Sequence, residues 1–347
     1  MKSFLPIILI GLFIIPMSLA CNPSAVQPLP IPADATASKP LVNTSQPANF
    51  ELAEFNHQQK LFSMLIPAGW KVREEETFAT FAAPDETASI MAAVENTGIA
   101  LDEASFTNYI TLTEKNNFSH LKDYKQEEAK LDNHLGIATV RSQFYLANEA
   151  QELSSIYIRK ENIIITMRLQ ANRSEYLKLE KLFDQVMNSA KFDLDKATGL
   201  IPYNMVYDFA HPMNVFTLKI PTSWRYNREE FANFAIDRFY SPDGLAWIEN
   251  LTYDDGNVIK PNQAFTITAN LVWELFAKDL RISEMKPQPD GSTRWVWRSD
   301  RNNIQGTTFY ELRGTKFLML SLITKKEVQE VIAPLFSLII QNYTPLP

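Results

Sequence analysis

The chain carries one motif twice, and this repeat limits the folds that it can adopt. Residues 62–70 read FSMLIPAGW and residues 216–224 read FTLKIPTSW. In each copy every second residue is apolar, as along a strand, up to a proline that cannot donate to a sheet ladder. Trp70 and Trp224 lie 154 residues apart, which suits a complete domain and is far longer than a solenoid unit. The sequence therefore predicts two copies of one globular domain.

Matching positions continue beyond the motif and set the expected boundaries. A Pro-Asp pair occurs at 84–85 and again at 242–243, and Gly136 has a counterpart in Gly291. The offsets between such pairs differ by only a few residues, so the insertions between the copies are short. We expect a first domain at 50–195, a linker at 196–204 and a second domain at 205–347.

The N-terminus is typical of a secretory signal. Lys2 precedes an apolar run from Phe4 to Met17, which is short for a membrane span of about 20 residues. The only cysteine, Cys21, follows Ala20 directly, and this segment resembles the lipobox of bacterial lipoproteins. The resemblance implies that residues 1–20 are removed and that Cys21 carries lipid and becomes the mature N-terminus. An uncleaved anchor and an unlipidated secreted protein are the alternatives.

The composition of residues 21–49 indicates a tether between the lipid and the first domain. They are rich in Pro, Ala, Ser and Thr and contain few large apolar residues, so they cannot bury a core and are expected to be disordered. The membrane is therefore the first expected partner, through lipid on Cys21. The domains would lie outside the cytoplasm, anchored to the cell membrane or the outer membrane.

Composition argues against several other classes of protein. The formal net charge of −7 disfavours nucleic acid as a partner. With Cys21 consumed by lipid, no disulfide and no cysteine-based metal site can form. The four histidines have no metal-type spacing, and no catalytic or phosphate-binding motif is found. We therefore expect no catalytic residue, no metal and no cofactor, and we consider an enzyme the less favoured class.

Periodicity predicts strands between these landmarks and two helices in each copy. One helix is expected at 103–115, capped by Asp102, and another after Asn172, with Glu175 completing a capping box. The second copy predicts helices at 263–277 and after Thr324. An α+β (α/β) fold class follows, because most of the remaining sequence has the alternation of strands.

The order of these elements resembles the Mog1/PsbP-like fold. The residues that carry the resemblance are Phe62, Pro67, Gly69 and Trp70 in the first copy, with Phe216, Pro221 and Trp224 in the second. The resemblance implies two tandem domains, each with a central antiparallel sheet flanked by helices. It also implies binding or assembly rather than catalysis.

Tryptophan distinguishes the second copy from the first. Five of the six tryptophans lie there: Trp224, Trp247, Trp273, Trp295 and Trp297. Trp295 and Trp297 are two residues apart on a predicted strand and therefore share a face. If a helix covers that face they fill the core, which we favour; if the face is open, they would anchor a sugar or a protein. Together with Trp247 they are the candidate partner-binding residues.

The sequence thus predicts a membrane-anchored lipoprotein of the cell envelope that acts as a non-catalytic binding or assembly module, with a protein partner in the envelope. Two alternatives stay open. One is an extracytoplasmic hydrolase with a carboxylate pair of the glycoside type. The other is a carbohydrate-binding protein that uses the tryptophan-rich second domain.

Overall fold

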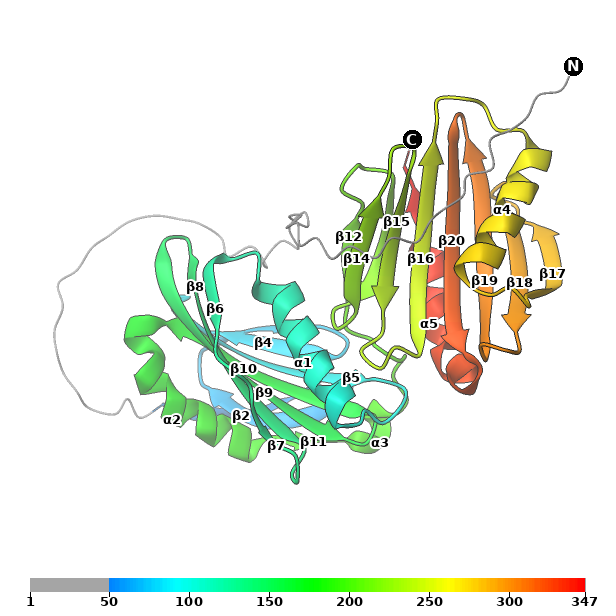
Figure 1. Cartoon of the computed structure of the whole chain (residues 1–347). Helices are drawn as coiled ribbons and strands as arrows, with labels where there is room; N and C mark the ends of the chain where they lie inside the picture. Colours follow the sequence, from blue (N-terminus) through cyan, green and yellow to red (C-terminus); the bar gives the residue numbers. More distant parts are fainter. Residues whose placement is uncertain (1–49, 347) are drawn as a thin grey trace, which may run out of the picture.

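The computed structural model describes residues 50–346, and Figure 1 shows its two halves, each built around a large antiparallel sheet. The expected signal peptide (1–20), the lipidation site Cys21 and the tether (21–49) lie outside the described residues. The expected α+β fold class with antiparallel sheets is confirmed by the sheet topology. Among the described residues, no helix combines the length and the apolar character needed to cross a membrane.

The first half contains two sheets and three helices. Its strands are β1 (Leu52–Asn56), β2 (Phe62–Pro67), β3 (Lys71–Glu74), β4 (Phe78–Ala82), β5 (Ala88–Asn96), β6 (Lys122–Gln126), β7 (Lys130–Asp132), β8 (Ile137–Leu146), β9 (Glu149–Lys160), β10 (Ile163–Asn172) and β11 (Lys191–Phe192). Its helices are α1 (Glu103–Phe118), α2 (Arg173–Ser189) and α3 (Leu194–Ala197). The large sheet has the order β3-β4-β5-β10-β9-β8-β6 with β7 beside β8, and the small sheet has the order β1-β2-β11.

The second half repeats this plan. Its strands are β12 (Val206–Ala210), β13 (Phe216–Pro221), β14 (Arg225–Glu230), β15 (Phe234–Tyr240), β16 (Ala246–Asp254), β17 (Arg281–Pro287), β18 (Thr293–Ser299), β19 (Ile304–Arg313), β20 (Lys316–Lys325) and β21 (Thr344–Pro345). Its helices are α4 (Pro261–Leu275), a short 3₁₀ turn η1 (Lys326–Val328) and α5 (Gln329–Asn342). The large sheet has the order β14-β15-β16-β20-β19-β18-β17, and the small sheet has the order β12-β13-β21.

Each large sheet has a core on both of its faces. In the second half, Leu218 of β13, Leu335 of α5 and Leu320 of β20 share one core between the large sheet, the small sheet and α5. On the opposite face, Val272 of α4 packs with Trp295 of β18. The first half has the same layers, with α2 and the small sheet on one face and α1 on the other.

The repeated motif has a structural role in both halves. Trp70 is 8% exposed and Trp224 is 0% exposed, and each belongs to the core on the small-sheet side of its own half. An aromatic side chain placed after a strand-ending proline therefore fills space beneath the sheet.

One of the expected helix caps forms and two do not. The Asp102 side chain accepts a hydrogen bond from the Ser105 amide and caps α1, as the sequence predicts. The Asn172 side chain does not cap α2, because it bonds Glu149 and Gln151 on the neighbouring strand β9 instead. Thr324 lies within β20, since that strand continues to Lys325, and α5 begins later, at Gln329.

The segment predicted as a linker is held firmly between the halves. The Asn96 side chain at the end of β5 donates to the carbonyls of Thr198 (3.1 Å) and Leu200 (2.8 Å). The Asn204 side chain accepts from the Asn96 amide (2.8 Å) and donates to the Val94 carbonyl (3.0 Å), and so continues the pairing of β5. Residues 196–204 therefore form an ordered seam that contacts the end of β5.

Helix α1 also contacts the second copy of the motif. The Asn116 side chain donates to the carbonyls of Thr222 (2.8 Å) and Trp224 (2.9 Å), in the turn that follows β13. Nearby, the Asn108 side chain donates to the carbonyl of Pro242 (2.8 Å). These bonds satisfy backbone carbonyls that the turns leave unpaired, and they fix one half against the other.

Candidate functional site

The tryptophans of the second half fill the space beneath α4. Trp295 is 0% exposed and Trp297 is 1% exposed, and both belong to the core between α4 and the large sheet. The Trp297 ring stacks on Phe276, with 5.1 Å between the ring centroids. Its Nε1 atom donates to the Thr308 hydroxyl (2.9 Å). Trp295 and Trp297 are therefore packing residues, because α4 covers their face of the sheet. This agrees with the favoured core alternative and corrects their use as candidate partner-binding residues.

A glycine on the neighbouring strand makes room for Trp297. Gly306 of β19 is paired with Trp297, and a Cβ atom added there would lie 2.4 Å from the tryptophan ring. The corresponding pair in the first half is Ser142 and Leu153. The first half thus has a small residue (Ser142) beside a large one (Leu153), whereas the second half has a large residue (Trp297) beside glycine (Gly306).

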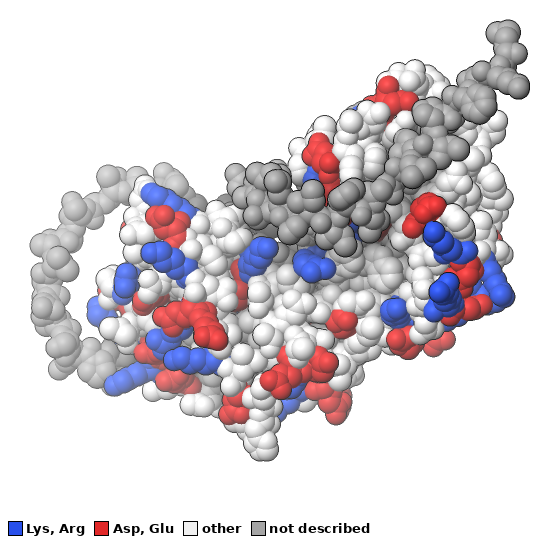
Figure 2. All heavy atoms as spheres, viewed as in Figure 1, with Lys and Arg blue, Asp and Glu red and all other residues white. Residues whose placement is uncertain are grey.

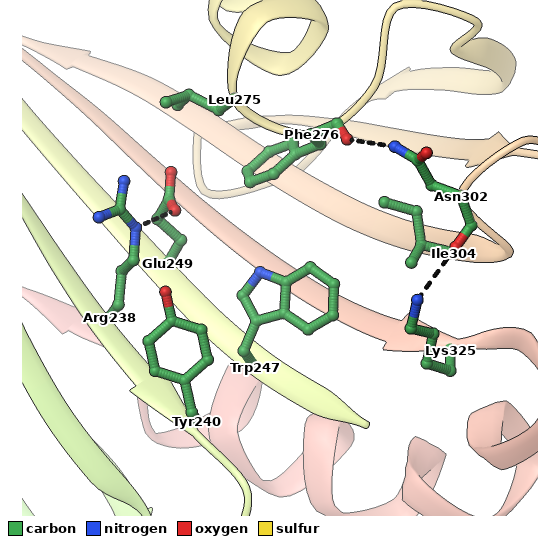
Figure 3. Close-up of a pocket in the computed structure, with 9 residues that line it drawn as sticks. All are labelled: Arg238, Tyr240, Trp247, Glu249, Leu275, Phe276, Asn302, Ile304 and Lys325. Atoms are coloured by element: carbon green, nitrogen blue, oxygen red, sulfur yellow. Dashed lines mark hydrogen bonds and ion pairs between the residues drawn. The ribbon is translucent and has the colours of Figure 1, made fainter. Parts of the chain in front are cut away.

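Trp247, the third candidate partner-binding residue, lies at an open pocket on the same face of the sheet. The pocket has a volume of about 460 Å³, within the range of about 300–1,000 Å³ that is usual for small-molecule sites. Figure 3 shows its lining residues: Arg238, Tyr240, Trp247, Glu249, Leu275, Phe276, Asn302, Ile304 and Lys325. It lies near the C-terminal end of α4, whose last residue, Leu275, lines it together with residues of β15 and β16; Figure 1 shows α4 lying across this face of the sheet.

Strand register brings the four central side chains together. In the antiparallel hairpin of β15 and β16, Arg238 is paired with Glu249 and Tyr240 with Trp247. Alternate residues of a strand point to the same face, so all four side chains project toward the α4 side. The pocket therefore has two adjacent rows, one charged and one aromatic.

In the charged row, Arg238 forms ion pairs with two glutamates. Arg238 Nε lies 2.6 Å from Glu249 Oε2, and Arg238 Nη1 lies 2.6 Å from Glu229 Oε1. Glu249 is only 3% exposed, and burial raises the pKa of its carboxyl above the usual range, although the Arg238 charge opposes this shift. The second oxygen, Oε1, is buried and has no hydrogen-bond partner among the described residues. A buried acceptor without a partner is costly, and Glu249 is one of the residues that line the pocket.

The opposite wall comes from the end of α4 and from the ends of two strands. The Asn302 amide donates to the Phe276 carbonyl (3.0 Å), and Lys325 Nζ donates to the Asn302 carbonyl (3.1 Å). Phe276 is also the residue that stacks on Trp297. Trp297 thus supports the wall residue Phe276, although Trp297 itself does not line the pocket.

The chemistry of this pocket suits binding. Among its lining residues Glu249 is the one acid, and Arg238 holds one of its oxygens. A glycosidase-type mechanism requires two carboxyl groups about 5–9.5 Å apart across the substrate. Glu229 contacts the same arginine but does not line the pocket. The arrangement offers hydrogen bonds and aromatic surface to a ligand and gives no pair of carboxylates to act on it.

A second buried polar cluster lies beneath α1 in the first half. Tyr109 donates to Glu95 (2.5 Å) and Tyr157 donates to Glu114 (2.5 Å). Arg168 donates to the Tyr157 hydroxyl (2.7 Å). Burial raises the pKa of Glu95 to about 8, so this carboxyl is mostly protonated at neutral pH. These groups are enclosed between helix and sheet, where they take the place that tryptophans occupy in the second half.

The visible surface mixes the two signs of charge. On the face drawn in Figure 2, lysine and arginine side chains alternate with aspartate and glutamate over both halves, and white areas separate them. Exposed pairs of opposite charge among the described residues include Arg73 with Glu75 and Lys178 with Glu175. No extended region of one sign is seen on this face of the described residues.

The sequence analysis identified Trp247 but not its neighbours. Arg238 and Tyr240 stand two residues apart before the turn at 241–244, and Trp247 and Glu249 stand two apart after it. Folding this segment as a hairpin would have placed the four residues on one face. The signal was present in the alternation, and the repeated Pro-Asp pair marked the turn.

The comparisons with known proteins show only remote likenesses. No protein-family model and no curated protein matches the chain. Cyanobacterial PsbP (CyanoP) from Synechocystis is similar over 45% of this chain and 100% of its own, at 16% identity with a TM-score of 0.32. LpqN, involved in cell envelope biogenesis of Mycobacterium tuberculosis, is similar over 41% of this chain and 91% of its own, at 10% identity with a TM-score of 0.27. The T6SS immunity protein TplEi from Pseudomonas aeruginosa is similar over 81% of this chain and 99% of its own, at 13% identity with a TM-score of 0.23. Likenesses at this distance carry no function to the present chain.

Proposed function

We propose that the chain is a lipoprotein of the cell envelope that binds a small ligand in the pocket beside Trp247 and does not transform it. One observation carries the binding role: Glu249 Oε1 is buried at an open pocket and has no partner among the described residues. Natural structures rarely leave such an acceptor unpaired. A ligand that donates to it would remove this cost, and the aromatic row beside it would supply contact area.

The proposed location in the cell envelope rests on the N-terminal sequence. An apolar run followed by Cys21 resembles a lipobox, and residues 21–49 have the composition of a tether. Lipid on Cys21 would keep the pocket near the membrane surface, and more than one acyl chain is needed for stable anchoring. A protein partner in the envelope is part of the same proposal, since a tethered binding module would pass its ligand or its signal to a neighbour.

Replacing Cys21 by alanine is expected to release the protein from the membrane. Without the thiol no diacylglyceryl group can be attached, and the remaining apolar segment is short for a span. The measurement is metabolic labelling with palmitate together with membrane fractionation in a bacterial host, comparing the wild type with Cys21→Ala. Ser24→Ala serves as the control, because it changes a tether residue outside the expected site. Unchanged membrane retention and labelling of Cys21→Ala would contradict the lipid anchor.

Occupation of the pocket can be tested without knowing the ligand. In a spectrum of the ¹⁵N-labelled protein, the indole signal of Trp247, assigned with Trp247→Phe, is expected to shift with some members of a library of neutral, cationic and anionic fragments. Trp273, which is 44% exposed on α4 and does not line the pocket, provides the internal control. A library that leaves the Trp247 signal unmoved, or moves both signals alike, would count against the binding role.

A further inference from the structure

We infer that the ligand of the Trp247 pocket is a neutral saccharide, a sugar ring that stacks on the indole and gives a hydroxyl to Glu249. This inference rests on the proposed binding function and deepens it. It depends on three features of the pocket: its aromatic surface, its unpaired acceptor and its balance of charge.

The aromatic surface suits a flat ring with an apolar face. Trp247 is half-buried, and Figure 3 shows its indole in the middle of the pocket, with Tyr240 on one side and Phe276 across from it. The C–H groups of a pyranose form an apolar face of this kind, while its hydroxyls point outward from the rim. Tryptophan provides a large rigid surface at a small cost in side-chain entropy.

The polar groups require a ligand that both donates and accepts. Glu249 Oε1 needs a donor. Figure 3 shows the Tyr240 hydroxyl and the Trp247 ring nitrogen directed toward the side where Glu249 and Phe276 lie, and the Trp247 N–H can only donate. A sugar hydroxyl combines one donor with two acceptor lone pairs. Several hydroxyls on one ring can therefore satisfy groups that a purely donating or purely accepting ligand would leave unpaired.

The charges disfavour an ionic ligand of either sign. An ammonium group could lie over the indole, but Arg238, 2.6 Å from Glu249, already neutralises the carboxylate, and Lys325 adds a positive charge at the rim. The lining has two cations, Arg238 and Lys325, and an anion would have to compete for groups that are already bonded: Arg238 to Glu249 and Glu229, and Lys325 to the Asn302 carbonyl. Because each charged group of the lining already has a partner within the protein, the chemistry favours an uncharged, hydroxyl-rich ligand.

The test uses the purified full-length protein and defined probes. Methyl glucoside, methyl galactoside, methyl mannoside and N-acetylglucosamine are titrated by calorimetry and by saturation-transfer NMR, with choline and glucuronate as the cationic and anionic comparisons. At least one neutral probe is expected to bind saturably. Trp247→Ala is expected to weaken that binding at least about tenfold, or about 1.4 kcal/mol, and Trp247→Phe to restore part of it. Glu249→Gln, which keeps the shape but loses the charge-assisted bond, is expected to weaken binding several-fold.

Trp273→Ala is the matched control, since it removes an indole of α4 from outside the pocket and is expected to leave binding unchanged. Choline or glucuronate binding at Trp247 in place of the neutral probes would overturn the saccharide inference. Neutral binding that survives Trp247→Ala would also overturn it. If fragments shift the Trp247 signal but no saccharide binds, the binding function stands and only the saccharide inference falls. If neither a fragment nor a saccharide binds in the pocket, the binding function and the saccharide inference are both wrong.

Discussion

Changing Trp297 to serine is expected to destabilise the second half by about 3–5 kcal/mol, the usual loss for removing a large buried aromatic side chain. The indole is 1% exposed, stacks on Phe276 and donates to Thr308. Gly306→Leu alone is expected to cost about 3 kcal/mol, because even its Cβ atom would lie 2.4 Å from the indole. The double variant, which imports the Ser-Leu pair of the first half, is expected to be more stable than the sum of the single changes predicts.

The measurement is a double-mutant cycle of urea unfolding, in which compensation appears as a coupling free energy of about 1–3 kcal/mol. Trp273→Ser is a suitable control, since this exposed tryptophan contributes little to the core. Additive single changes would show that the two positions do not share the space between α4 and the sheet. The interpretation that the residues at 297 and 306 differ together from Ser142 and Leu153 of the first half, because they share one space, would then be wrong.

Replacing Glu95 by glutamine is expected to remove a pH dependence of stability. Burial raises the pKa of this carboxyl from its usual value of 4.5 to about 8. Between these values the folded protein holds one more proton than the unfolded chain. Stability therefore falls as pH rises, by about 1.4 kcal/mol for each pH unit, and is fully retained only below the unfolded value. Glutamine keeps the shape and still accepts from Tyr109, but it has no proton to lose.

At pH 8 the Glu95→Gln protein is expected to be more stable than the wild type by about 4 kcal/mol. The two proteins should be similar near pH 4.5. The measurement is urea unfolding of both proteins between pH 5 and pH 8, with the exposed Glu127→Gln as the control. Equal slopes against pH for wild type and Glu95→Gln would show that this carboxyl keeps the same protonation state on folding.

The repeat made most of the fold predictable, because both copies had to satisfy the same pattern. The long strands β8, β10 and β20 lie in segments with alternating or continuous apolar residues, and both patterns predict strands. The edge strands β1, β3, β12, β14 and β17 and the two-residue strands β11 and β21 were missed, because short or exposed edge strands show no clear apolar period. The local sequence pattern also did not show that Asn172 bonds residues of β9, or that β20 continues past Thr324. For this reason neither residue caps a helix as predicted.

The site was only partly predictable. The clustering of tryptophans directed attention to the half that contains the candidate pocket, and Trp247 lines that pocket. The burial of Trp295 and Trp297 depends on where α4 packs, and this is a tertiary outcome. The pair of Arg238 and Glu249 needed the hairpin register, since each residue alone looks like an ordinary surface charge.

The seam between the copies makes them dependent on each other. Tyr203 precedes the expected start of the second domain, yet its ring is fully buried against Trp224, with 5.8 Å between centroids. Its amide bonds the Asn96 carbonyl of the first copy. A fragment beginning at residue 205 would leave a hole beside Trp224, and a fragment ending before residue 198 would remove the Thr198 and Leu200 carbonyls that accept from the Asn96 side chain. Each half therefore completes the packing and hydrogen bonding of the other, and neither can be removed without leaving unpaired groups or a cavity in the half that remains.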